Sequence, residues 1–185
     1  MPDMVLLETE EAMEQRLDAL SKEFSKVRTG RANPGMLADV RVDYYGASTP
    51  LSQIGNITVP EASQLIVKPY DRSVLSAIEK AINAANLGLN PANEGTQLRI
   101  VLPALTTETR KGLVKQIHKL GEESKIYIRN SRRDGNDAIK KMEKNSEISE
   151  DDSKGYHEDI QELTNSYTVK IDELVKAKEI DIMHI

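Results

Sequence analysis

Three stretches of the sequence place apolar residues on one narrow stripe of a helix, and this feature constrains the fold most. In the first stretch the stripe consists of Leu6, Met13, Leu17, Leu20, Phe24 and Val27. In the second it consists of Leu113, Ile117, Leu120, Ser124, Ile128, Ser131, Gly135, Ala138 and Met142. In the third it consists of Tyr156, Ile160, Leu163, Tyr167, Ile171 and Leu174. Because a long helix cannot bury such a stripe alone, we expect the three helices to pack together as a bundle.

The ends of these helices carry separate signals. The first helix is predicted to stop near Arg28, with Gly30 as a left-handed terminating residue. Thr106 is a suitable N-cap for the second helix, and Ser149 followed by three acidic residues is a strong start for the third.

Small residues line the middle of the second helix, so its neighbours are expected to approach it closely there. The same residues weaken the helix itself, since Gly121 and Gly135 should each cost about 1 kcal/mol relative to alanine in an exposed helix interior.

Between residues 31 and 104 the pattern changes to that of short strands. Val40, Val42 and Tyr44 alternate with polar residues, so Tyr44 and Tyr45 should point to opposite faces of a strand, and a turn is expected at 46–50. Further strands are expected at 57–59, 65–67 and 98–102, with one helix between them that begins after Asp71. These patterns predict a small β/α/β module.

The order of the patterns predicts an α+β protein of two domains. Residues 1–30 and 105–185 form a discontinuous three-helix bundle, and residues 31–104 form the β/α/β domain inserted into it. Two connections that contain Gly and Pro join the domains, and we expect them to act as a hinge. The hinge residues are Gly30, Arg31, Ala32, Asn33, Pro34, Gly35, Pro103, Ala104 and Leu105.

Charge is unevenly distributed along the chain, although the net charge is only −5. Residues 105–145 carry 11 basic and 6 acidic side chains (+5), whereas residues 146–185 carry 4 basic and 11 acidic ones (−7). Residues 1–30 carry 4 basic and 7 acidic side chains (−3), and residues 31–104 carry 6 of each. A polyanion is therefore expected to meet one basic helix rather than the whole surface.

The sequence also indicates a compartment. It contains no cysteine, which suits a reducing cytosol. No apolar run reaches the ~20 residues that cross a bilayer, and the first seven residues do not resemble a secretory signal. The chain is expected to be cytoplasmic, without a membrane partner.

No catalytic constellation is visible. His118, His157 and His184 lie on different elements without a partner at an informative spacing, so the first two are interpreted as solvated surface residues. The segment 28–35 matches neither a P-loop nor a dinucleotide-binding loop, and 150–152 is interpreted as a helix start rather than a metal site. We expect no enzymatic activity, cofactor, metal or small-molecule substrate.

Arg129, Arg132 and Arg133 fall on one face of the second long helix, away from its apolar stripe. Because guanidinium groups bind phosphate as planar forks and stack on bases, three of them on one face suit folded RNA. The alternative is that the basic residues of this helix balance the acidic third helix, and spacing alone leaves both interpretations open. The further residues in this alternative are Arg110, Lys111, Lys115 and Lys119.

Several longer segments can be compared with known families. They include Val27-Arg-Thr-Gly-Arg-Ala-Asn-Pro34, Tyr44-Tyr-Gly-Ala-Ser-Thr-Pro-Leu51, Tyr70-Asp-Arg-Ser73, Leu105-Thr-Thr-Glu-Thr-Arg-Lys111 and Arg129-Asn-Ser-Arg-Arg-Asp134. In this order they resemble the ribosome recycling factor family over essentially the whole chain. The resemblance implies an L-shaped, non-enzymatic monomer that binds large-subunit RNA of the post-termination ribosome. It also implies that elongation factor G with GTP acts on the complex to separate the subunits, with release of mRNA and deacylated tRNA.

Carried over position by position, the family's RNA-contacting arginines correspond to Arg129 and Arg132. Their neighbours in this assignment are Arg133, Arg110, Arg28 and Arg31. Gly135 stands where the family pattern has alanine, which implies a looser helix just beyond the arginines.

Two other classes of protein deserve comparison with this expectation. The long helices alone would permit a coiled-coil chaperone or structural adaptor, but that class does not account for the inserted module. An RNA-modifying enzyme is disfavoured by the missing nucleophile, base and cofactor loop.

Overall fold

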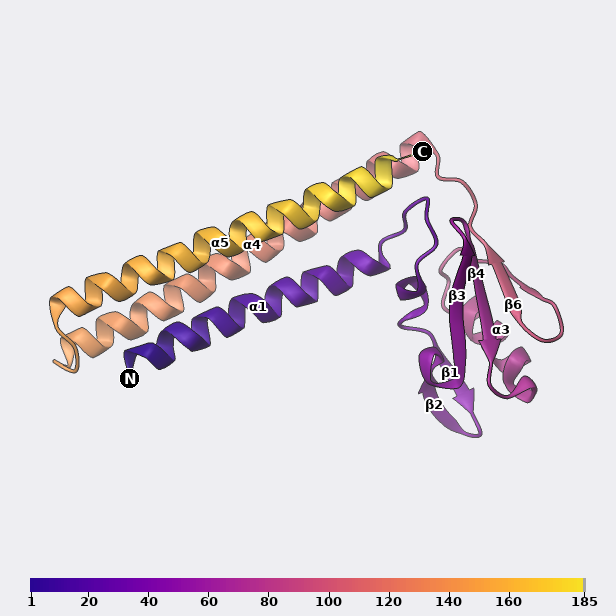
Figure 1. The fold of residues 1–185 in the computed structure, drawn as a ribbon, viewed down its shortest axis with the longest axis horizontal. Coiled ribbons are helices and arrows are strands. Elements are labelled where there is room, and N and C mark those ends of the chain that lie inside the picture. Colours follow the sequence, from indigo (N-terminus) through magenta and orange to yellow (C-terminus); the bar gives the residue numbers. More distant parts are fainter. Residues whose placement is uncertain (185) are drawn as a thin grey trace. The chain divides into compact units, whose positions relative to one another are not determined.

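The structure is a computed structural model that describes residues 1–184, and its chain divides into two compact units (Figure 1). The helical unit consists of Met1–Phe24 with Val114–Ile180, and the β-containing unit consists of Ser25–Leu113 with residues 181–184. The three boundaries, after residues 24, 113 and 180, therefore fall within long helices and outside the predicted hinge segments at 30–35 and 103–105. Within residues 1–184, no helix combines the length and the apolar character that a membrane crossing requires.

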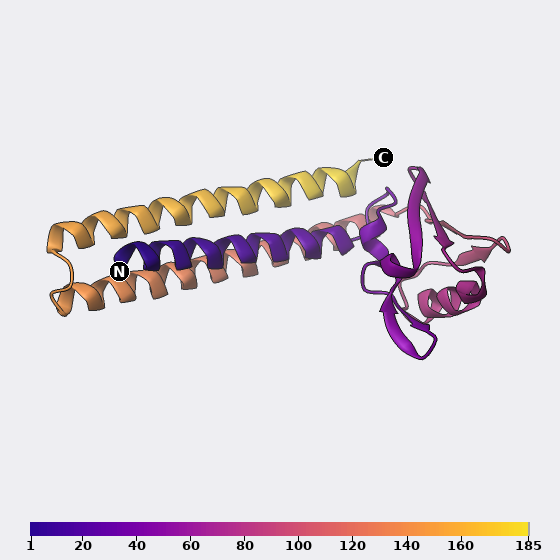
Figure 2. The same cartoon turned by 60° about the horizontal axis from the view of Figure 1, so that its bottom comes forward.

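Three long helices make the helical unit: α1 (Pro2–Lys26), α4 (Thr107–Lys144) and α5 (Glu150–Met183). They lie side by side in both views, with α1 and α5 running in the same direction and α4 running opposite to them (Figures 1 and 2). Their shared core contains Met13, Leu20, Phe24, Ile117, Ile128, Ile139, Ile160, Tyr167, Ile171 and Val175. The predicted three-helix bundle is thereby confirmed.

The predicted close approach of helices along α4 is also confirmed. A β-carbon on Gly121 would lie 2.6 Å from Cγ2 of Val175 on α5, and Ser124 is fully buried. The buried stripe nevertheless differs in detail from the prediction, because Gly121 and Ile139 are buried while Leu120 and Ala138 are only partly covered. A helix packed against two neighbours buries a wider arc than one seam.

The helix starts follow the sequence signals, whereas one predicted helix end is wrong. At α5, the amide of Asp152 donates to Ser149 Oγ at 3.1 Å, and the Ser149 hydroxyl donates to Asp152 Oδ2 at 2.7 Å. At α4, the amide of Thr109 donates to Thr106 Oγ1 at 3.1 Å. Helix α1 ends at Lys26, and Gly30 is not among the glycines with positive φ, so it does not terminate the helix in a left-handed conformation.

The β-containing unit has one antiparallel sheet and one hairpin. The sheet has the strand order β3-β4-β6-β5, formed by Gly55–Glu61, Gln64–Pro69, Leu98–Val101 and Pro91–Asn93 respectively. The hairpin pairs β1 (Arg41–Tyr44) with β2 (Ala47–Pro50). The helical elements are η1 (Pro34–Leu37), α2 (Leu51–Ile54), η2 (Arg72–Val74) and α3 (Leu75–Ala84).

A single apolar core holds this unit together. It includes Val42 of β1, Leu65 and Val67 of β4, Ile78 and Ile82 of α3, and Leu98 and Ile100 of β6, all at most 1% exposed. The α/β composition agrees with the predicted β/α/β module, and Asp71 caps the following helical segment as expected, because its side chain accepts the amide of Ser73 at 2.9 Å.

Three elements of this unit differ from or add to the prediction. Residues 47–50 form strand β2 rather than part of a turn, because Tyr45 (φ 50°) and Gly46 (φ 84°) already reverse the chain. Strand β5 and helix α2 were not predicted. Tyr44 packs against the core while Tyr45 is 76% exposed, as their opposite orientations require.

Candidate nucleic-acid interface

Arg129, Arg132 and Arg133 all lie on α4, in the helical unit. Arg129 and Arg133 are exposed, and Arg132 is partly buried at the α5 side, where its Nη1 donates to Gln161 Oε1 at 3.2 Å. The Gln161 amide in turn donates to Asn165 Oδ1 at 2.9 Å. Arg132 thus has a neutral partner that orients its guanidinium without neutralising it.

The three arginines have no acidic partner within the described part of the chain. Among residues 1–184, no carboxylate oxygen lies within 4.0 Å of their guanidinium nitrogens. The helix beneath them is fixed by Ile128 and Ile139, both fully buried. We call Arg129, Arg132 and Arg133 the arginine face, a set of cationic donors without a carboxylate partner among the described residues.

Two lysines of α4 have carboxylate partners, in contrast to the arginine face. Lys125 contacts Asp172 of α5 at 2.5 Å and Glu122 at 3.2 Å, and the hydrogen bond to Asp172 is the main reason why the pKa of Lys125 is raised. Lys119 approaches Glu123 of its own helix at 4.0 Å. The alternative interpretation, in which basic residues of α4 pair with the acidic helix α5, therefore holds for Lys125. Lys111 and Lys115 are exposed, and among the described residues no carboxylate lies within 4.0 Å of them.

The remaining predicted arginines lie in the β-containing unit. Arg110 Nη1 donates to the carbonyl oxygens of Met183 and His184, at 3.1 and 3.3 Å. A positive charge at this position stabilises the C-terminal end of α5. Arg28 Nη2 donates to the Pro103 carbonyl at 2.5 Å, and its buried Nε has no partner among the described atoms. Arg31 is exposed. Two of these three arginines therefore make contacts within the fold that sequence spacing did not reveal.

The first predicted hinge segment is held by several hydrogen bonds. Thr29 Oγ1 accepts the amide of Arg31 at 3.2 Å and donates to the Arg31 carbonyl at 3.1 Å. Asn33 Oδ1 accepts the amide of Gly35 at 2.8 Å, and the amide of Ala32 donates to the Ala62 carbonyl at 2.5 Å. A pivot at this segment is a prediction that these contacts constrain but do not test.

Two histidines interpreted from sequence as solvated have specific partners. His118 Nε2 lies 2.9 Å from Glu179 Oε2, and His157 Nδ1 lies 2.7 Å from Asn136 Oδ1. Both contacts join α4 to α5. They give the histidines a structural environment, and His118 remains about half exposed.

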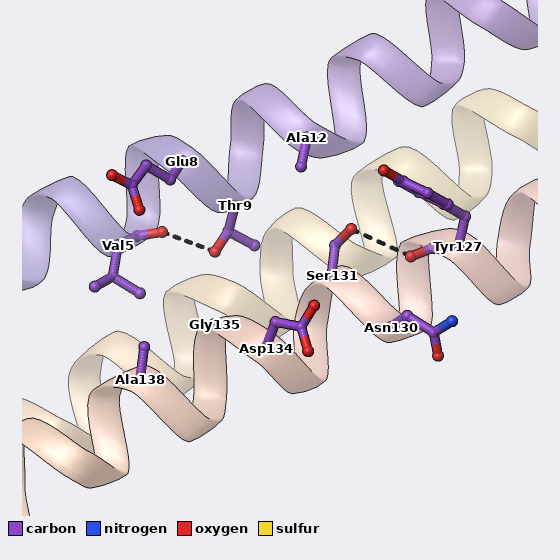
Figure 3. Close-up of a pocket in the computed structure, with 10 residues that line it drawn as sticks. All are labelled: Val5, Glu8, Thr9, Ala12, Tyr127, Asn130, Ser131, Asp134, Gly135 and Ala138. Atoms are coloured by element: carbon purple, nitrogen blue, oxygen red, sulfur yellow. Dashed lines mark hydrogen bonds between the residues drawn. The ribbon is translucent and has the colours of Figure 1, made fainter.

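A groove between α1 and α4 was not predicted. It encloses about 310 Å³, and Figure 3 shows small residues on both walls, with Thr9 and Ala12 facing Ser131 and Gly135. Tyr127 stands at one end, where its ring lies 5.8 Å from the guanidinium carbon of Arg16. The small residues at 131, 135 and 138 are the sequence signal that indicates this close helix pair.

The fold and the arginine face define a class of protein: a helical binding protein whose second, β-containing unit is inserted between its first two long helices. The profile of the family described as "Ribosome recycling factor" matches residues 20–183. The chain belongs to the ribosome recycling factor family.

Individual relatives agree over the full length. The chain is 54% identical to the ribosome-recycling factor of Bacillus cereus (strain B4264) and 53% identical to one from Bacillus thuringiensis (strain Al Hakam), over 185 residues that cover all of both proteins in each pair.

Solved structures show the same similarity. A solution structure of the ribosome recycling factor is 37% identical with a TM-score of 0.81, over 100% of this chain and 98% of the other. A second is 41% identical with a TM-score of 0.70, over 99% of both chains. It presents models for the T. thermophilus ribosome recycling factor and the E. coli elongation factor G bound to the E. coli post-termination complex.

Proposed function

We propose that the chain recycles ribosomes after translation termination. In this role it binds the post-termination ribosome in the cytoplasm and, together with elongation factor G and GTP, promotes dissociation of the subunits and release of mRNA and deacylated tRNA. Membership of the ribosome recycling factor family supports the proposal, as do the full-length relatives of that name. A similar protein has been described with elongation factor G on the post-termination complex.

The observation that carries the binding step is the arginine face. Phosphate groups attract guanidinium groups through charge-assisted, often bidentate hydrogen bonds. A surface arginine that already pairs with a carboxylate would lose that pair on binding RNA, whereas Arg129, Arg132 and Arg133 have no such pair to lose. We therefore assign contact with large-subunit ribosomal RNA to these three, with Arg132 as the central residue because Gln161 holds its side chain.

The neighbouring arginines receive secondary roles in the proposal. Arg31 is exposed and available for phosphate, while Arg110 and Arg28 each use some of their N–H donors in hydrogen bonds to backbone carbonyls. A guanidinium has five N–H donors, so both can contact RNA with the rest.

The protein itself is proposed to act as a monomer that binds and moves, not as an enzyme. GTP hydrolysis belongs to the elongation factor, and no cofactor is required of this chain. The two connections at 30–35 and 103–105 are proposed to let the β-containing unit change its orientation while the arginine face keeps hold of the RNA. Binding and motion would then be separable.

The arginine assignment can be tested by measuring the affinity of the purified chain for ribosomes at several salt concentrations. Arg132→Ala should lower the affinity about tenfold or more at moderate salt, because a charge-assisted contact is worth roughly 1.5–3 kcal/mol. It should also reduce the slope of log affinity against log salt by close to one, the loss of about one phosphate contact.

Two further variants make the test specific. Arg132→Lys retains the charge but loses the planar fork, so it should bind with intermediate affinity. Lys154→Ala is the matched control, because this exposed lysine pairs with Glu150 on α5 and belongs to no predicted site. Unchanged affinity of Arg132→Ala, with circular dichroism showing intact helices, would reject the arginine face as the RNA contact.

A further inference from the structure

The two acidic helices of the bundle are neighbours. Residues 1–30 and 146–185 carry net charges of −3 and −7, from 4 basic and 7 acidic and from 4 basic and 11 acidic side chains. These segments form α1 and α5, which run side by side in the same direction (Figures 1 and 2). The arginine face belongs to α4, the remaining helix of the bundle. Positive charge is therefore concentrated on α4 and negative charge on α1 and α5.

Two hollows lie between α1 and α5, and we call them together the α1–α5 groove. The first, of about 500 Å³, contains partly buried Leu6 and Leu163 with three carboxylates around them, Glu10, Asp159 and Glu162. The second, of about 440 Å³, contains partly buried Leu17 and Leu174 with Asp18, Glu173 and Lys170. Each hollow thus combines an apolar floor with a border of net negative charge.

The region between the hollows is also negative. Tyr167 of α5 is buried there and donates its hydroxyl to Glu14 Oε2 at 2.5 Å, while the ammonium group of Lys170 covers its ring at 4.3 Å. The pKa of Tyr167 is raised, first by burial and then by the hydrogen bond to Glu14 and the charges of Glu10 and Asp18. Burial is the main cause of this shift, and the carboxylates of Glu14, Glu10 and Asp18 add to it, so negative charge also lies near this tyrosine between the hollows.

The two hollows repeat at the same interval on both helices. Leu6 and Leu17 are 11 residues apart, and so are Leu163 and Leu174. At a rise of 1.5 Å per residue the apolar floors are about 16 Å apart. Since 11 residues are close to three helical turns, a single helix laid along the groove presents side chains at i and i+11 to both floors.

We infer that the α1–α5 groove is a docking site for a basic amphipathic helix of a partner protein. The apolar floors take two side chains such as Leu, Ile or Phe, 11 residues apart on that helix. Lysine and arginine side chains beside them pair with the carboxylates of the border. This second surface goes beyond the proposed RNA contact and does not depend on it.

Charge and burial argue against other occupants. RNA phosphates are repelled by a border of five carboxylates and one lysine. A second copy of the chain offers the basic helix α4, whose apolar residues at the matching interval are Ile117, Ile128 and Ile139. All three are fully buried in their own bundle, so the basic helix of a second copy cannot place these side chains in the hollows.

The inference is tested with the full chain and a fluorescent synthetic helix of about 18 residues, rich in lysine, with leucines on one stripe at i and i+11. A control peptide has the same composition with the leucines moved to different faces. The amphipathic peptide should bind at least about tenfold more tightly than the control, as measured by fluorescence anisotropy at moderate salt, because only it fills both hollows.

Charge reversal then locates the binding. The double variant Asp159→Lys with Glu162→Lys should lower the affinity for the amphipathic peptide about tenfold or more, since two border charges change sign. Glu158→Lys is the matched control, because Glu158 is an exposed carboxylate of the same helix that lines neither hollow. It should change the affinity less than about threefold.

Three results would overturn the inference. Equal binding of both peptides would mean unspecific attraction of a cation by an acidic protein. Equal effects of the border reversal and of Glu158→Lys would place the peptide elsewhere. Self-association of the chain in sedimentation velocity that Asp159→Lys with Glu162→Lys abolishes would make a second copy the occupant.

Discussion

A β-carbon added to Gly135 of α4 would lie 2.6 Å from Oγ1 of Thr9 on α1, a separation that real atoms do not tolerate. The Thr9 hydroxyl donates to the Val5 carbonyl at 2.7 Å (Figure 3). Ile160 of α5 closes the other side, with its Cδ1 at 3.3 Å from the added β-carbon. The sequence suggested that glycine here only loosens the helix. In the fold, the absence of a β-carbon at Gly135 allows α1 and α5 to pack closely against α4 at this point.

Gly135→Ala is therefore expected to destabilise the protein although alanine is the better helix former. Overpacking of a closed contact costs roughly 1–3 kcal/mol, and over most of this range the cost is larger than the gain of about 1 kcal/mol in helix propensity. The expected net loss is up to about 2 kcal/mol of unfolding free energy, measured by urea titration.

Gly155→Ala in α5 is the matched control, because nothing lies within 4 Å of a β-carbon there, and it should stabilise the protein by up to about 1 kcal/mol. Thr9→Ala combined with Gly135→Ala should recover part of the loss, since the pair is in contact. Equal stabilisation by both glycine replacements would show that α1 and α4 are not held this closely.

Lys125 and Arg133 lie on the same helix but should respond differently to truncation. Lys125 is only 19% exposed and bonds Asp172 of α5, so Lys125→Ala should lower the unfolding free energy by about 1 kcal/mol. Arg133 is exposed and unpaired, so Arg133→Ala should stay within about 0.5 kcal/mol of the parent. Urea unfolding of both variants checks this, and a large loss for Arg133→Ala would assign that residue a structural role.

The heptad-like stripes made the bundle predictable because burial of Met13 or Ile128 follows from spacing within one helix. The arginine face was predictable for the same reason. Strand β2 was not, since Ala47–Pro50 has no strand-like alternation of its own and exists through pairing with β1. Contacts that join distant segments were equally hidden: Arg28 meets a carbonyl 75 residues away.

Acid should weaken the contribution of Asp71, the N-cap of η2. Its carboxylate accepts the amide and hydroxyl of Ser73 and the Tyr45 hydroxyl, at 2.9, 2.7 and 2.8 Å, and these bonds, led by the Ser73 amide, lower the pKa of Asp71 below its ordinary value of 3.8. Because the folded pKa is the lower one, the stabilisation is complete above 3.8 and is lost as pH falls through the folded value.

An NMR titration of the Asp71 carboxyl should therefore give a midpoint below 3.8. Tyr45→Phe removes one donor and should move that midpoint upward. The melting temperatures of the parent and Asp71→Asn should differ at neutral pH and converge in acid. A midpoint at or above 3.8 in the parent would contradict the capping arrangement.

The proposed pivot at residues 30–35 can be tested with a reversible cross-link. A β-carbon on Gly35 would lie 3.3 Å from Cβ of Ser25, close to the 3.5–4.5 Å that disulfides span, and the chain has no cysteine of its own. Oxidised Ser25→Cys with Gly35→Cys closes a loop around the first connection. We expect ribosome affinity to be unchanged, because the arginine face is untouched, and elongation-factor-dependent subunit splitting to stop.

The same protein after reduction with dithiothreitol is the control, and it should split ribosomes at the parent rate. Light scattering follows the splitting and cosedimentation follows the binding, so the two steps are read separately. If the oxidised variant splits ribosomes as fast as the reduced one, the first connection does not need to move and the pivot must be sought elsewhere. If oxidation instead abolishes binding, attachment and motion are coupled through residues 25–35, and the proposed separation of the two roles fails.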